Sequence, residues 1–361
     1  MTLVKDKRNL ILTGVAIGII SVALVLLGNP GNMGFCIACF LRDIAGAVKL
    51  QTAGVVQYVR PEIIGLILGS FIISLLKGEF KPRGGSAPIT RFFIAFMVMI
   101  GALVFLGCPF RMVLRLAAGD LNALVALAGF ASGIAIGCYF LSKGFSLGRA
   151  RTQTKSEGVV LPASTILLFV LFIAVPSIFA FSTSGPGSMH APIIASLAAG
   201  LIVGIMAQRT RMCMVGGIRD VILVKDWTLL GGFIAIFASA LVMNIATGKF
   251  NLGFAGQPVA HSQHVWNFLG MLVVGLGSAL LGGCPLRQLV LAGEGNTDSA
   301  VAVLGLIAGA AFAHNFSLAS SAYSATSVGG PSIYGKVAVI GSIAILLAIA
   351  SINTFIKKRE A

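Results

Sequence analysis

Long apolar segments recur along the whole chain and are separated by shorter polar segments. Several of them approach the roughly twenty residues that an α-helix needs to cross the hydrocarbon of a bilayer. The clearest are residues 10–28, 63–76, 121–141, 162–181, 229–246 and 337–352. This pattern predicts an all-α, polytopic membrane protein in contact with the lipid bilayer.

The composition supports this interpretation. Of 361 residues, 57% are hydrophobic and only 10% are charged, and the mean hydropathy is +0.98. A soluble core could not enclose so much apolar surface. The first apolar segment follows Lys5, Lys7 and Arg8, but no clear cleavage site with small residues closes it, so we expect a retained helix.

The chain contains an internal repeat. Residues 33–44 align with residues 210–221, and both segments carry a cysteine followed by an Arg-Asp pair. Residues 107–111, Gly-Cys-Pro-Phe-Arg, align with residues 283–287, Gly-Cys-Pro-Leu-Arg, in the same order and at nearly the same offset. Two such blocks make a chance match an unsatisfactory explanation.

The basic residues predict the orientation of the two halves. Loops 77–91 and 143–155 contain four Lys or Arg each, whereas loops 248–265 and 316–334 contain only Lys249. By the positive-inside rule the first two are cytoplasmic and the last two face outward. The rule also explains the net charge of +15 without a nucleic-acid partner.

Two inverted-topology repeats follow from this orientation. We expect a first membrane repeat over 1–160, a linking transmembrane helix within 161–185, centred on 162–181, and a second repeat with a C-terminal helix over 186–361. The layout has about ten long helices and four short re-entrant ones, and both termini are cytoplasmic. Inverted repeats with interrupted helices are typical of transporters.

The cysteines of the repeat lie at predicted helix breaks. The two Gly-Cys-Pro segments consist of Gly107, Cys108 and Pro109 and of Gly283, Cys284 and Pro285. Proline disfavours helix at the preceding residue and can serve as the first residue of a new helix. Each cysteine is then at the positive end of a half-helix dipole, where anions bind.

Two further breaks are expected beside the other repeated cysteines. Residues 29–32 interrupt the chain just before Cys36, and Gly216-Gly217 interrupts it just after Cys213. By inversion, Cys36 and Cys108 belong to the outward half of a pathway, and Cys213 and Cys284 belong to the inward half. We treat the six cysteines as free thiols, because most lie in apolar or Gly-rich sequence.

On these motifs the sequence resembles the YeeE/YedE family of sulfur-transport membrane proteins, and within it the YedE-like branch associated with selenium metabolism. The resemblance covers nearly the whole chain. It implies a thiosulfate-type importer in which cysteine thiols pass the anion along by S–H hydrogen bonds, without covalent turnover or a cofactor. The selenium branch implies a selenium compound and a small cytosolic TusA-like carrier protein as partner.

Several candidate residues also have ordinary structural explanations. Cys39 and Cys138 have no cysteine mate in the repeat, and a Cys36-x-x-Cys39 pair without further ligands is a weak metal or redox motif. Arg111 and Arg287 either attract the anion or extend to lipid headgroups. The Arg-Asp pairs either steer substrate or anchor the short helices, with anchoring favoured.

The remaining ionisable groups give weaker indications. Asp120 and Glu294 are loop caps or proton-coupling groups. The four histidines, His190, His261, His264 and His314, are expected in solvated outward loops. No buried carboxylate stands out in the sequence.

The sequence therefore predicts a non-enzymatic transporter of the bacterial inner membrane that imports a small sulfur- or selenium-containing anion. Its predicted pathway is lined by the four repeated cysteines with Cys39, Arg111 and Arg287. The alternatives are a membrane thiol-disulfide redox protein that uses Cys36 and Cys39, and a structural subunit of a larger complex.

Overall fold

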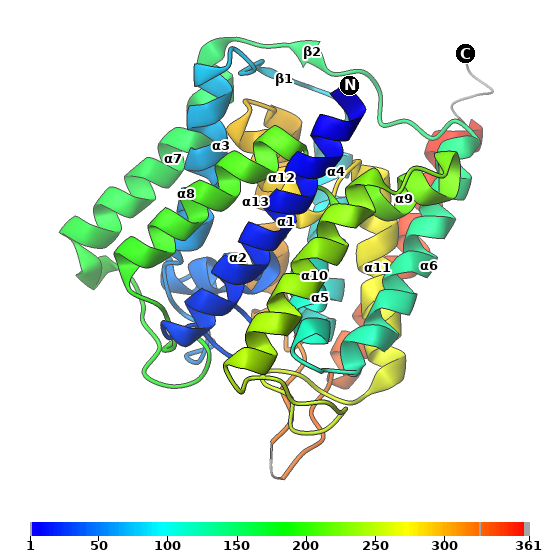
Figure 1. Ribbon diagram of the computed structural model, residues 1–361. Helices are drawn as coiled ribbons and strands as arrows, with labels where there is room; N and C mark the ends of the chain where they lie inside the picture. Colours follow the sequence, from blue (N-terminus) through cyan, green and yellow to red (C-terminus); the bar gives the residue numbers. More distant parts are fainter. Residues whose placement is uncertain (1, 325, 357–361) are drawn as a thin grey trace.

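The computed structural model describes residues 2–324 and 326–356, which are mostly helical (Figure 1). The long helices of this part of the chain are α1 (Thr2–Leu26), α3 (Pro61–Leu76), α4 (Pro88–Phe105), α6 (Asn122–Ser142), α7 (Lys155–Ala174), α8 (Ile193–Thr210), α10 (Thr228–Ala246), α11 (His264–Leu281), α13 (Thr297–Asn315) and α14 (Ile333–Ser351). The short ones are α2 (Ile37–Ala47), α5 (Pro109–Ala117), α9 (Met214–Val224) and α12 (Pro285–Gly293). A 3-10 turn (Pro176–Ile178), a π-helical turn (Ile352–Ile356) and strands β1 (Arg83–Gly84) and β2 (Arg151–Thr152) complete the described elements.

The predicted fold class is confirmed. Nine helical segments of the described residues are long and apolar enough to cross a membrane, and α3 is a shorter apolar helix. The protein is thus an all-α, multi-pass membrane protein.

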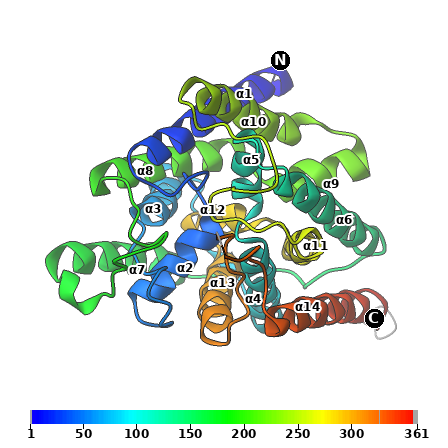
Figure 2. The same cartoon turned by 90° about the horizontal axis from the view of Figure 1, so that it is seen from below.

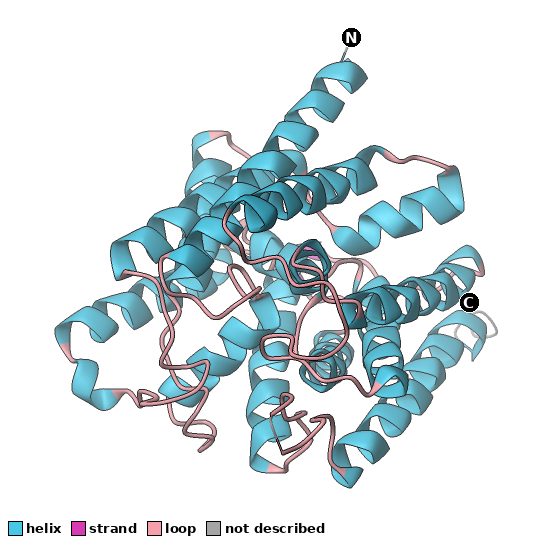
Figure 3. Ribbon diagram, turned by 60° about the horizontal axis from the view of Figure 1, so that its bottom comes forward, coloured by secondary structure: helices cyan, strands magenta, loops and turns pink. Residues whose placement is uncertain are grey.

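The loops sort to two ends of the molecule. The start of α1 and the paired strands β1 and β2 lie at the top of Figure 1, and the segments 247–263, 316–324 and 326–332 lie at the bottom. Seen with the bottom turned forward, irregular segments gather over this end (Figure 3). The loops rich in Lys and Arg are therefore together at one end, as predicted; which end faces the cytoplasm stays a prediction.

Helix pairs recur between the two halves. Helix α1 packs on α10 as α8 packs on α3, and α6 packs on α11 as α13 packs on α4 (Figure 2). Glycine permits this close approach. A Cβ on Gly69 of α3 would lie 2.2 Å from the carbonyl oxygen of Leu201, and one on Gly204 of α8 would lie 2.2 Å from that of Leu66.

Loop contacts recur in the same way. The backbone N–H of Lys81 donates to the carbonyl of Glu294 (3.2 Å), and that of Asn251 donates to the carbonyl of Ala118 (2.9 Å). The first contact joins the segment after α3 to the segment after α12. The second joins the segment after α10 to the segment after α5. Such duplicated contacts are what a repeat would produce, and the inversion of the halves stays a prediction.

Two predicted element boundaries are wrong. The linking helix does not occupy 162–181, because Thr154 and Glu157 form a capping box that starts α7 at Lys155. Pro162 lies inside this helix, which ends at Ala174, just before Pro176. The local caps outweigh the apolar pattern from which the boundaries were predicted.

The predicted break after Cys213 is also misplaced. Gly216 and Gly217 are helical residues of α9, and the interruption precedes Cys213, where Arg211 adopts a left-handed conformation (φ 52°). Glycine is tolerated in the first turn of a helix where a neighbouring helix packs too closely to leave room for a side chain. A Cβ on Gly217 would lie 3.1 Å from the backbone nitrogen of Leu230 in α10.

Candidate functional site

Each of the four short helices begins directly after a cysteine. Cys36, Cys108, Cys213 and Cys284 are the N-cap residues of α2, α5, α9 and α12, and all four have extended backbone conformations. Helix N-termini present unpaired N–H groups and the positive end of the helix dipole. The cysteine thiols therefore occupy the positions at which helices favour anions.

The four thiols cap their helices in two ways. The Sγ of Cys36 accepts from the N–H of Cys39, and the Sγ of Cys213 accepts from the N–H of Gly216, both at 3.3 Å. Cys108 and Cys284 make no such bond and are followed by proline at the first helical position. Proline has no N–H, so these two helix entrances are formed by chain stiffness instead.

The thiols come together as two pairs. The Sγ atoms of Cys36 and Cys108 are 4.0 Å apart, and the side chains of Cys213 and Cys284 are also neighbours. All six cysteines are free and buried. None of the four capping thiols therefore faces lipid, and each pair joins two helix entrances of one half of the sequence.

Cys39 lies beside the pair of Cys36 and Cys108, whereas Cys138 lies on a long helix. The Sγ of Cys39 lies 3.9 Å from the carbonyl oxygen of Leu106 and 3.8 Å from Nη1 of Arg111. Cys138 is buried within the long helix α6 and caps none of the short helices.

Arg111 holds loops together. Its guanidinium donates to the Oδ1 of Asn32 (2.8 Å), to the backbone carbonyls of Pro258 (3.2 Å) and Val259 (3.3 Å), and to that of Leu106. The side chain is fully buried. It does not extend to headgroups, and its donors are already occupied by neutral oxygens.

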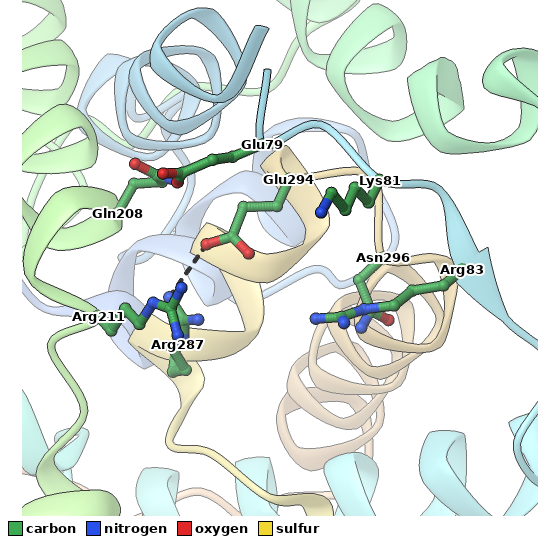
Figure 4. A pocket seen from close by; sticks show the side chains of 8 residues that line it. All are labelled: Glu79, Lys81, Arg83, Gln208, Arg211, Arg287, Glu294 and Asn296. Atoms are coloured by element: carbon green, nitrogen blue, oxygen red, sulfur yellow. Dashed lines mark hydrogen bonds and ion pairs between the residues drawn. The ribbon is translucent and has the colours of Figure 1, made fainter. Parts of the chain in front are cut away.

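Arg287, at the equivalent position of the second half, lies in a different environment. Its Nη1 donates to Oε1 of Glu294 at 3.2 Å, and both side chains are about 15% exposed. The pair lines a cavity of about 220 Å³ shown in Figure 4, which we call the Arg287 pocket. Its charged lining residues are Glu79, Lys81, Arg83, Arg211, Arg287 and Glu294.

A second, smaller cavity lies near Arg111. This cavity of about 130 Å³, the Asn32 pocket, is lined by Asn32, Lys249, Asn251 and Pro258 among others. Its loop 247–263 is at the bottom of Figure 1, whereas β1, beside the Arg287 pocket, is at the top. The two pockets thus lie at opposite ends, and neither is lined by a cysteine.

The Arg-Asp pairs of the repeat form local ion pairs. Asp43 is buried between Arg42 and Arg60, with nitrogen–oxygen distances of 2.7 Å to both guanidinium groups. The equivalent pair of Arg219 and Asp220 is 2.8 Å apart and partly exposed. Both pairs fix their short helices locally, which agrees with the favoured anchoring role.

Buried carboxylates are present, contrary to the sequence interpretation. Glu62 accepts from Asn29 (2.9 Å) and Ser196 (3.0 Å) through Oε1, while its Oε2 has no hydrogen-bond partner. Asp120 is buried, pairs with Arg115 at 2.6 Å and caps the start of α6 through Asn122. Sequence reasoning missed Glu62, because nothing in the sequence places its helix start inside the protein.

Two of the histidines are not in solvated loops. His261 is buried with its Nε2 2.7 Å from the carbonyl oxygen of Val104, and His314 lies inside α13 with an unpartnered Nε2. His190 and His264 are exposed, as expected; His190 stacks on Tyr58. The loop that carries His261 folds back onto the end of α4 at Val104 instead of extending into water.

The fold and the buried thiols define a class: a multi-pass helical membrane protein with interrupted helices and cysteines at the interruptions. Comparison with known proteins shows a similarity to one family. Residues 209–361 match the family model described as "Sulphur transport". This part of the chain, which includes Cys213 and Cys284, is thus similar to the sulphur-transport family that the sequence motifs indicate.

Two relatives carry a specific name. The chain is 35% identical over 108 residues to the "Thiosulfate transporter TsuA" of Spirochaeta thermophila and 32% identical over 119 residues to the protein of the same name from Escherichia coli. The matched segments cover 30% and 32% of this chain and 32% of each relative. Both are named as transporters and not as enzymes.

Proposed function

We propose that this protein is a transporter of the bacterial inner membrane that imports a small sulfur-containing anion such as thiosulfate, with both chain ends in the cytoplasm. The observation that carries the proposal is the set of four buried cysteines, each at the N-terminus of a short helix. The similarity to thiosulfate transporters supports the substrate class. A selenium analogue is a second candidate substrate.

The physical argument concerns desolvation. An anion that leaves water loses strong hydrogen bonds, and a bilayer interior offers no replacement. Helix N-termini supply N–H donors, and a thiol adds a weak, polarisable S–H donor suited to a sulfur anion. Four such positions, arranged as two pairs, provide successive stations of moderate affinity, which a conduction path needs.

The proposed route has a definite order. The anion enters at the Asn32 pocket, passes Cys36 and Cys108, then Cys213 and Cys284, and leaves through the Arg287 pocket. A TusA-like carrier protein would receive it there. In this scheme the thiols stay reduced, since each step exchanges hydrogen bonds only.

The experiment is uptake of labelled thiosulfate, sulfate and selenite into proteoliposomes that contain the purified protein. We expect Cys108→Ala and Cys284→Ala to reduce thiosulfate uptake at least tenfold. Cys138→Ala is the matched control, because it removes a buried thiol outside the short-helix entrances. Uptake that survives both substitutions would contradict the proposed path.

The same variants address the redox alternative. A thiol-disulfide protein based on Cys36 and Cys39 would lose function when either is replaced and would tolerate Cys284→Ala. Here the Sγ of Cys36 accepts the N–H of Cys39 at 3.3 Å, an ordinary helix cap. This contact gives no specific reason to favour redox chemistry.

A further inference from the structure

The Arg287 pocket differs from the equivalent region around Arg111 in a way that indicates a binding site. Both arginines come three residues after a capping cysteine. The aliphatic part of each side chain lies over the glycine that precedes this cysteine. A Cβ on Gly107 would lie 3.1 Å from Cδ of Arg111, and one on Gly283 would lie 3.0 Å from Cγ of Arg287. The two side chains therefore leave their helices in the same way.

Their partners are of different kinds. Arg111 is fully buried, and its donors are bound to carbonyl and amide oxygens that belong to the fold. Arg287 has one described partner, the carboxylate of Glu294, and it faces a cavity. At the position of Glu294 the first half has Ala118. A carboxylate on the wall of a cavity can be replaced by another anion, whereas backbone carbonyls cannot.

The cavity carries an excess of positive charge. Its lining contains Lys81, Arg83, Arg211 and Arg287 against Glu79 and Glu294. Glu79 is already bound by Gln208 (2.7 Å) and by Arg209 (2.9 Å) outside the lining.

Within the part of the chain that the structure describes, three of the four cations have no carboxylate partner. Among the described residues, Lys81, Arg83 and Arg211 form no ion pair within 4.0 Å. In Figure 4 the ammonium of Lys81 points toward Glu294 from the side opposite Arg287.

The size of the cavity suits a small oxyanion. Its volume of about 220 Å³ is about seven times the ~30 Å³ that one water molecule occupies in the liquid. An anion of five heavy atoms fits there with part of its hydration. Guanidinium groups bind the paired oxygens of such anions in a fork geometry.

We propose that Arg287, Lys81 and Arg211 form a binding site for a small divalent oxyanion, and that Glu294 is a resident counter-ion which the incoming anion displaces from Arg287. The proposal rests on the proposed function, because it identifies this pocket as the station at which the transported anion leaves the protein. Glu294 sets the affinity. When no substrate is bound, the Glu294 carboxylate pairs with Arg287. When substrate is bound, the same negative charge lowers the affinity enough for release.

The test is equilibrium binding, measured by titration calorimetry with sodium thiosulfate and sodium sulfate on the purified full chain in neutral nanodiscs. The background carries Cys36→Ala and Cys108→Ala, which remove the proposed stations at the other end of the route. Binding in this background does not depend on transport. If binding is retained here but uptake survives Cys108→Ala and Cys284→Ala, the transport path alone is refuted. If uptake depends on these cysteines as proposed but no anion binds here, this site alone is refuted.

Glu294→Gln is the decisive variant. It removes the competing charge, and we expect both anions to bind about tenfold more tightly, which is about 1.4 kcal/mol. A gain in affinity cannot result from misfolding. Arg287→Gln should weaken binding at least tenfold, and Lys81→Gln or Arg211→Gln should weaken it about threefold each.

Arg149→Gln is the matched control, because it removes a positive charge from an exposed loop residue outside the pocket lining. It should leave both affinities unchanged. If Glu294→Gln and Arg287→Gln bind the anions like the parent protein, or if Arg149→Gln weakens binding as much as Arg287→Gln does, the basic residues contribute only general positive charge and the proposed site does not exist.

Discussion

The buried ion pairs of Asp43 allow a quantitative prediction. Its Oδ1 accepts from Nε and Nη2 of Arg42 at 2.9 and 2.7 Å, and its Oδ2 accepts from Nε of Arg60 at 2.8 Å. The three side chains are at most 2% exposed. Asp43→Asn keeps the shape but leaves two guanidinium charges without a counter-charge and places an NH₂ donor against one of them.

The expected magnitude follows from burial. Removing one partner of a buried ion pair costs about 3–5 kcal/mol, because the remaining charge has neither water nor a partner. The repeat supplies a matched control in Asp220→Asn. The side chains of Arg219 and Asp220 are 35% and 23% exposed, and water can solvate the charge that remains, so we expect a loss of at most about 1 kcal/mol.

The assay is equilibrium unfolding of both variants in mixed micelles with increasing denaturing detergent, followed by tryptophan fluorescence. Asp43→Asn should lower the free energy of unfolding by at least ~2 kcal/mol more than Asp220→Asn. Adding Arg60→Gln to Asp43→Asn should recover part of the loss, since it removes one of the two uncompensated charges. Equal losses for the two single variants would refute the argument from burial.

Three further predictions concern pH, packing and thiol geometry. Burial lowers the pKa of His261 to about 4, below the unfolded value of about 6.5. Because the unfolded chain therefore binds the proton first, the free energy of unfolding should fall by up to ~3 kcal/mol as the pH decreases from 6.5 to 4. His261→Gln should flatten this part of the pH profile of the unfolding free energy. Gly34→Ala would place a Cβ 1.8 Å from a carbonyl oxygen of α1 and should destabilise the protein by roughly 3 kcal/mol in the same assay, whereas Gly54→Ala, with open space around it, should be neutral. Oxidation with copper phenanthroline should join Cys36 to Cys108, whose sulfurs are 4.0 Å apart, into a disulfide visible as a linked peptide by mass spectrometry; recovery of only unlinked peptides would contradict the pairing.

Much of the architecture was predictable from local rules. Apolar length predicted membrane helices, because a lipid-exposed backbone must satisfy its own hydrogen bonds. The Gly-Cys-Pro segments predicted new helices at Pro109 and Pro285, where α5 and α12 begin. The start of α7 was predicted too late in the sequence, because the prediction used only the apolar pattern. The capping box of Thr154 and Glu157 indicates the observed start.

The candidate site was predictable in its members but not in its contacts. The repeat singled out the four cysteines, and each is a helix N-cap. Their pairing, Cys36 with Cys108 and Cys213 with Cys284, joins residues about 70 positions apart, and no local pattern reports such contacts. The burial of Glu62 and His261 was missed for the same reason.

By itself, the sequence determined that the chain belongs in a membrane, which segments are helical, and which cysteines interrupt them. These properties depend on residue type and short-range spacing. Only the tertiary structure decided that Arg111 is held by carbonyl oxygens while Arg287 faces a cavity beside Glu294. The two motifs are nearly identical as sequence, and their environments differ in part because loops from the other half, around Pro258 and around Lys81, fold over them. These distant segments help to set the environment of each arginine, and a local pattern does not contain them.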